Sequence, residues 1–124
     1  MKRKTMSIIT NIMINQSSLS GADFKEAVDL GLVCAAFDQT VNLIFVDAGI
    51  NNLINGQMAS KINDRNHVDI IKGLEFYDIE NIYLEKESLD KTCLKIDDLL
   101  PSIKLITSAE INQLNRKANH LVVF

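Results

Sequence analysis

The two cysteines, Cys34 and Cys93, are the side chains of this sequence best suited to carry sulfur. A cysteine that accepts or passes on sulfur needs an accessible thiol with a lowered pKa. Cys34 lies on the apolar stripe of a predicted helix, so we expect an inert core residue. Cys93 follows the turn after the third predicted strand, where Lys91 favours a thiolate and Asp90 opposes it. We therefore expect neither cysteine to carry sulfur.

The other polar groupings are weak candidates for a binding site. Asp64 and His67 are spaced to share one helix face, but two ligands do not make a metal site. His120 precedes the last predicted strand and has no obvious carboxylate partner. The serine-rich loop 15–21 ends at a helix start, where free amides can hold an anion. It lacks both glycine patterns of nucleotide sites, so we expect no metal and no cofactor.

Strand-like and helix-like segments alternate along the sequence, which is typical of a parallel sheet covered by helices on both faces. We predict one domain over residues 1–124, with a three-layer α/β/α fold and a five-stranded, mainly parallel sheet. Residues 41–46 are almost continuously apolar, which indicates a strand in the interior of that sheet. The predicted strands are 6–14, 41–46, 81–84, 104–107 and 121–124, and the predicted helices are 21–37, 49–54, 63–74 and 108–117.

Charge and composition limit the classes of partner. The formal net charge is -3 and the pI is about 5.3, which argues against direct nucleic-acid binding because phosphate contacts need clustered Lys and Arg. No segment approaches the roughly 20 apolar residues of a membrane span. The basic start at residues 2–4 lacks the features of a signal peptide. Two cysteines without paired spacing indicate a reducing compartment, so we predict a cytoplasmic protein.

The first predicted helix is more apolar than a surface helix needs to be. Between Ala27 and Phe37 only Asp29 is charged, so the apolar residues cannot all face the sheet. A helix covered on both sides within its own domain is one explanation, but an outer helix of such a fold normally keeps a polar face. We therefore predict a subunit interface. Its candidate contact residues are Leu30, Val33, Phe37, Phe76 and Tyr77.

One ordered run carries a family resemblance. Gly73-Leu74-Glu75-Phe76-Tyr77-Asp78-Ile79-Glu80-Asn81 leads into a short strand, and Ser88-Leu89 follows in a turn. This run resembles the Gly-Leu-Tyr-Asp-Ile-Glu motif of the TusC/DsrF-like family of the bacterial sulfur relay, although Phe76 interrupts it. The register of the other segments, down to the final Leu121-Val122-Val123-Phe124, extends the resemblance over nearly the whole chain.

The resemblance implies a non-catalytic subunit of a cytoplasmic heterohexamer with TusB-like and TusD-like subunits. That complex takes persulfide sulfur from a TusA-like donor and passes it to a TusE-like acceptor, towards 2-thiouridine at the tRNA wobble position. In the related TusD subunit the working cysteine directly follows the third strand. The matching position here is Leu84 or Glu85, neither of which can carry sulfur.

The sequence leaves three alternatives open. One is a sulfurtransferase in its own right that uses Cys93, which requires a reactive thiol. The second is a subunit for sulfur oxidation of the DsrEFH type, whose members share the same fold. The third is a small flavodoxin-like module that binds an anion or a nucleotide at loop 15–21, which copurified flavin or nucleotide absorbance would reveal.

Overall fold

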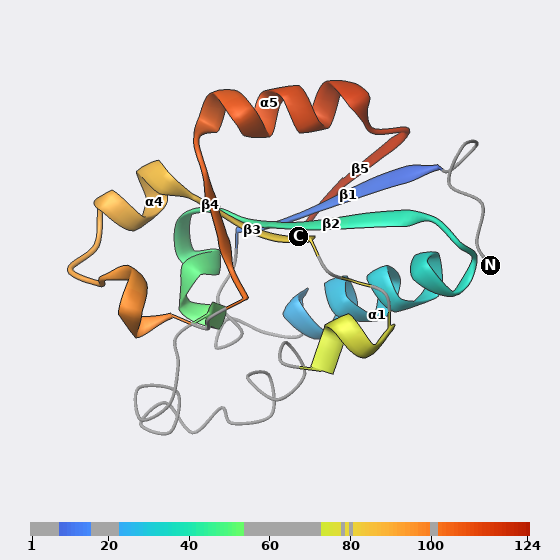
Figure 1. Cartoon of the computed structure of the whole chain (residues 1–124), viewed down its shortest axis with the longest axis horizontal. Helices are drawn as coiled ribbons and strands as arrows, with labels where there is room; N and C mark the ends of the chain where they lie inside the picture. Colours follow the sequence, from blue (N-terminus) through green and yellow to red (C-terminus); the bar gives the residue numbers. More distant parts are fainter. Residues whose placement is uncertain (1–7, 16–22, 54–72, 78, 80, 100–101) are drawn as a thin grey trace.

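Five parallel strands form one sheet among the described residues, in the order β4-β3-β2-β1-β5 (Figure 1). The structure, a computed structural model, describes residues 8–15, 23–53, 73–77, 79, 81–99 and 102–124. All neighbouring strands pair in parallel, and β2 lies in the interior between β1 and β3, as predicted. The strands are β1 (Ile9–Ile14), β2 (Thr40–Phe45), β3 (Asn81–Glu85), β4 (Lys104–Ile106) and β5 (His120–Val123).

Helices cover both faces of the sheet, which confirms the predicted three-layer arrangement (Figure 1). On one face lies α1 (Asp23–Ala36), with the 3-10 helix η3 (Leu74–Tyr77) in contact with it. The helix α5 (Ser108–Lys117) runs above the opposite face. The remaining short helices are η2 (Asp47–Leu53), α4 (Lys86–Asp90) and η4 (Ile96–Asp98).

The structure differs from the sequence-based expectation mainly at the short helices. The predicted turn with Ser88-Leu89 is the helix α4, which is too short to show helical periodicity in its sequence. The predicted helix 49–54 begins two residues earlier, as the 3-10 helix η2. Nearly all of the predicted helix 63–74, and residues 6–7 of the first predicted strand, lie outside the described residues.

The main core lies between the sheet and α1. Alternate residues of β1 and β2, such as Ile12 and Leu43, are fully buried on this side. Gly31 lies at this contact, where a Cβ would meet Ile79 Cδ1 at 3.4 Å and Val41 Cγ1 at 3.5 Å, which are ordinary van der Waals distances. The α5 side has a smaller core around Ile44, Val46 and Ile111. Burial on both faces explains why β2 is almost continuously apolar.

Three asparagines connect α5 to the sheet. Asn42 Nδ2 donates to Asn11 Oδ1 at 2.8 Å, and Asn11 Nδ2 donates to Asn115 Oδ1 at 2.9 Å. Asn11 and Asn42 are buried, so these bonds satisfy amides that water does not reach. The Asn115 amide nitrogen in turn lies 3.6 Å from Met13 Sδ. The network therefore fixes where α5 lies over β1 and β2.

The end of α1 has the hydrogen bonds of a Schellman motif. The amide of Gln39 donates to Cys34 O at 3.1 Å, and the amide of Asp38 donates to Ala35 O at 3.0 Å. Asp38 has a φ of 65°, the left-handed conformation that this cap requires. The chain reverses here into β2 and leaves Phe37 exposed at the corner.

Candidate functional site

The carboxyl ends of β1, β2 and β3 lie side by side, at the edge where ligands of parallel α/β folds bind. The backbone is closely packed at this edge, since Val46 N donates to Ile14 O at 3.0 Å. A Cβ on Gly49 would lie 2.0 Å from Ile14 O, so only glycine fits. Asp47 has a φ of 50°, which aspartate tolerates better than most residues. The chain therefore turns sharply from β2 into η2.

Ser88 connects this turn to the end of β3. Its hydroxyl accepts a hydrogen bond from Asp47 N at 2.8 Å and donates one to Glu85 Oε1. The side chain is buried, so these two bonds use a hydroxyl that has no access to water. The serine of the family-like Ser88-Leu89 pair thus holds two strand ends together.

Glu85 is the last residue of β3, and both of its carboxylate oxygens are engaged. Oε1 accepts the Ser88 hydroxyl, and Oε2 accepts the Ser108 hydroxyl at 2.9 Å. Leu84, the neighbouring residue, is fully buried in the core. Neither position offers a thiol that could carry sulfur. The Glu85 carboxylate instead connects β3 to Ser88 of α4 and to Ser108, the first residue of α5.

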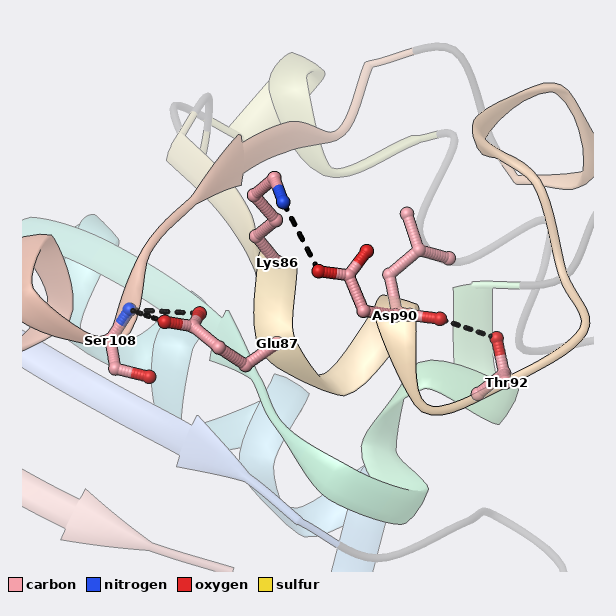
Figure 2. Close-up of polar contacts among 6 residues, drawn as sticks. Lys86, Glu87, Asp90, Thr92 and Ser108 are labelled. Carbon is pink, nitrogen blue, oxygen red and sulfur yellow. Dashed lines mark hydrogen bonds and ion pairs between the residues drawn. The ribbon is translucent and has the colours of Figure 1, made fainter.

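Glu87 makes a second connection between α4 and α5 (Figure 2). Its carboxylate oxygens accept the amide of Ser108 at 3.0 and 3.2 Å, at the helix start where free amides favour a negative charge. The pKa of Glu87 is held below its ordinary value by hydrogen bonds from its own backbone amide and from Ser108, although desolvation opposes this. An ionised carboxylate is therefore part of the folded structure at neutral pH.

The segment after α4 presents Cys93 to solvent. Lys86 pairs with Asp90 along α4 at 3.1 Å, and Thr92 Oγ1 donates to Leu89 O at 2.8 Å (Figure 2). Cys93 itself is exposed and forms no disulfide. Cys34, by contrast, is half-buried and packs against the main core. Exposure makes Cys93 the more accessible thiol, but accessibility alone does not make a thiol reactive.

The predicted interface residues differ in how far they are exposed. Leu30 is half-buried and packs against the core. Val33 is 55% exposed and Phe37 is 76% exposed, and Phe37 N donates to Val33 O at 3.3 Å, so the two residues lie one helical turn apart. Tyr77 is 63% exposed on η3. The side chain of Phe76 lies outside the described part of the structure.

Most of the remaining candidate residues lie outside the part of the chain that the structure describes. Asp64, His67 and loop residues 16–21 lie outside them, and His120 is exposed on β5. The described residues include no group of three His, Cys, Asp or Glu side chains that could hold a metal ion. Within the same residues, no helix has the length and apolar character needed to cross a membrane.

Sequence reasoning identified the Ser88-Leu89 pair but not what Ser88 does. It also missed Ser108, whose amide donates to the carboxylate of Glu87 in α4 and whose hydroxyl donates to the carboxylate of Glu85 in β3. The only sequence signal at that end of α5 is the Thr107–Glu110 capping box, in which Thr107 N donates to Glu110 Oε1 at 2.9 Å. That pattern marks the helix start but does not reveal its distant partners.

Comparison with known proteins places this architecture in a family. Residues 11–124 match the model of the DsrE/DsrF-like family. The TusC homolog of Vibrio vulnificus strain CMCP6 is 26% identical over 100 residues, which cover 81% of this chain and 85% of that protein. The intracellular sulfur oxidation protein DsrF of Allochromatium vinosum is 36% identical over 75 residues, or 60% of this chain and 55% of that protein.

A solved structure supports the same assignment at the level of the fold. The YchN protein from E. coli superposes with a TM-score of 0.70 at 15% identity, covering 96% of this chain and all of YchN. The family match spans residues 11–124, which include all or nearly all of the five strands. The chain therefore belongs to the DsrE/DsrF-like family, and its TusC and DsrF relatives confirm the predicted TusC/DsrF-like resemblance.

Proposed function

We propose that this chain is a non-catalytic subunit of a cytoplasmic, TusBCD-type sulfur relay complex that contributes to 2-thiouridine synthesis at the tRNA wobble position. TusB-like and TusD-like subunits would be its direct partners in a heterohexamer. A TusA-like donor and a TusE-like acceptor would act through the assembled complex. With a net charge of -3, the chain would not itself grip tRNA.

The observation that carries the proposal is the chemistry at the end of β3. The resemblance puts the sulfur-carrying position of a TusD-like subunit at Leu84 or Glu85. Leu84 is fully buried, and both oxygens of Glu85 accept serine hydroxyls. A site of this kind stabilises the strand ends but has no atom on which a persulfide could form. Sulfur chemistry would then belong to a partner subunit.

The exposed end of α1 supports a role in assembly. The outward residues of its first half are charged, whereas Val33 and Phe37 present apolar side chains to solvent. Tyr77 adds an exposed aromatic residue on the neighbouring η3. Aromatic and apolar side chains of this kind are typical anchors of protein interfaces. We assign the Val33–Phe37 patch of α1 to contact with a related subunit, and Tyr77 is a further candidate contact.

Two observations keep alternative functions in view. Cys93 is exposed, which a sulfurtransferase in its own right would require. The similarity to DsrF, an intracellular sulfur oxidation protein, favours sulfur oxidation as the alternative to tRNA thiolation. The structure bears little on the flavodoxin-like alternative, because loop residues 16–21 lie outside its described residues.

Coexpression tests the proposal directly. A tagged copy of this chain should copurify with the TusB-like and TusD-like proteins of the same cell, at fixed stoichiometry on sizing chromatography. A mock purification from cells that express the untagged chain is the control, since it captures only proteins that bind the resin. If this chain remains a well-behaved monomer at high concentration and ignores both candidate partners, the proposal is wrong.

A further inference from the structure

The strand β5 is an edge of the sheet. Within the described residues it pairs only with β1, and edge strands present unpaired backbone groups to other chains. Leu121 is 47% exposed and Val123 is 57% exposed. Leu121 lies beside Asn11 of β1 and Val123 lies beside Met13. Asn11 and Met13 both contact Asn115 of α5, so Leu121 and Val123 lie on the face of the sheet that α5 covers. Their exposure shows that α5 does not cover this face as far as β5.

The other edge strand, β4, carries a charged residue that disfavours pairing with another chain. β4 has only three residues and begins with Lys104, an exposed cation. The Lys104 ammonium lies 3.3 Å from Asn81 Oδ1 and 5.8 Å from the centre of the Tyr83 ring. An edge lysine is one of the devices that prevent strands from pairing with other chains, and it distinguishes β4 from the similarly short β5. Residues 118–124, which include β5, contain no Lys, Arg, Asp or Glu.

We propose that β5 pairs with β5 of a second copy of this chain, in antiparallel orientation across a two-fold axis at Val122. Such an axis places Val122 opposite its own copy and Leu121 opposite Val123 of the other chain. A two-fold contact brings each side chain close to its equivalent, so any charge on the strand would repel itself. Residues 121–123, which lie next to the proposed axis, are uncharged and avoid this repulsion. The pairing would also add cross-strand contacts between Leu121 and Val123.

Disulfide trapping tests the geometry, since directly opposed residues of an antiparallel pair have close Cβ atoms. Val122→Cys should form a disulfide-linked dimer under mild oxidation, in a Cys93→Ser background that removes the exposed native thiol. The matched control is Leu105→Cys on the other edge strand, in the same background. A Val122→Cys protein that stays monomeric, or that crosslinks no more than Leu105→Cys, overturns the pairing.

A charge on the edge tests the energetics independently. In sedimentation equilibrium the wild-type chain should dimerise, and Val123→Lys should weaken the dimer by roughly tenfold or more, whereas Leu105→Lys should leave it unchanged. Circular dichroism verifies that both variants are folded. A monomeric wild-type chain, or equal effects of the two lysines, contradicts the proposal. If Val123→Lys instead abolishes only the capture of a TusB-like or TusD-like subunit, the edge binds that subunit and self-pairing is wrong.

The two assembly surfaces can be distinguished by one further variant. Val33→Asp lies in the α1 patch rather than on β5, so Val122→Cys crosslinking should persist in its presence. Loss of the crosslink in a folded Val33→Asp protein would count against an independent β5 contact. The β5 proposal therefore stands or falls separately from the proposed relay function.

Discussion

Ser88 is the residue on which the candidate edge depends most, because one buried hydroxyl bonds to Asp47 N and to Glu85. Ser88→Ala would leave a backbone amide and a carboxylate oxygen without this partner. We expect the free energy of unfolding to fall by about 1–3 kcal/mol. Urea denaturation measures the change, and Ser102→Ala, at an exposed serine, is the control. Equal stability of the two variants would show that Ser88 does not hold the strand ends.

Glu87 makes stability depend on pH in a defined direction. Its folded-state pKa lies below the ordinary value of 4.5, so its contribution is present above that value and is lost as pH falls through the folded-state pKa. Glu87→Gln should therefore lower the urea midpoint at neutral pH and lose its effect as the pH falls through the folded-state pKa of Glu87, below 4.5. Asp97→Asn controls for the loss of one surface charge. A Glu87→Gln effect that grows towards low pH would have the wrong sign for this contact.

At the scale of elements, the asparagine network decides where α5 lies. Asn115→Ala would remove the acceptor of the buried Asn11 amide, which we expect to cost about 1–3 kcal/mol. Asn112→Ala is a matched control, since it makes the same change on the same helix at an exposed position. Both variants gain the same helix propensity, so only the network separates them. Similar unfolding midpoints would mean that apolar packing alone positions α5.

The regular elements were predictable because their signals are local. The continuous apolar stretch of β2 and the alternation of strands and helices follow from burial on a parallel sheet. The contacts that build the edge are not local: Glu85 and Ser108 are 23 residues apart, and Asn11 and Asn115 are 104 apart. The rotation of α1, which buries Leu30 in part and exposes Val33, likewise depends on packing that no sequence period specifies.

At the scale of the whole molecule, the α1 patch should be required for assembly but not for folding. Val33→Asp places a charge on an exposed residue, so the variant should fold normally and lose its TusB-like or TusD-like partner. Leu30→Asp should instead reduce stability, because Leu30 packs against the core. Circular dichroism and copurification on the same samples separate the two outcomes. Lys25→Glu, on the charged half of the helix, controls for an added acid.

If the Val33→Asp protein folds and still binds every partner, the α1 patch is not part of the interface. A Val33→Asp protein that unfolds would show that the residue belongs to the core of its own chain. The first result would leave family membership intact, because the fold does not depend on that surface. It would require another surface for contact with the related subunits.

The most direct test of the central claim is the 2-thiouridine content of tRNA in cells that lack this chain, measured by mass spectrometry of nucleosides. Removal of the chain should abolish or strongly reduce the modification, and either the wild-type chain or Cys93→Ser should restore it to the same level. That result would show that the modification depends on the chain but not on the thiol of Cys93. Unchanged 2-thiouridine after removal, or restoration by the wild-type chain alone, would contradict a non-catalytic subunit of a tRNA sulfur relay.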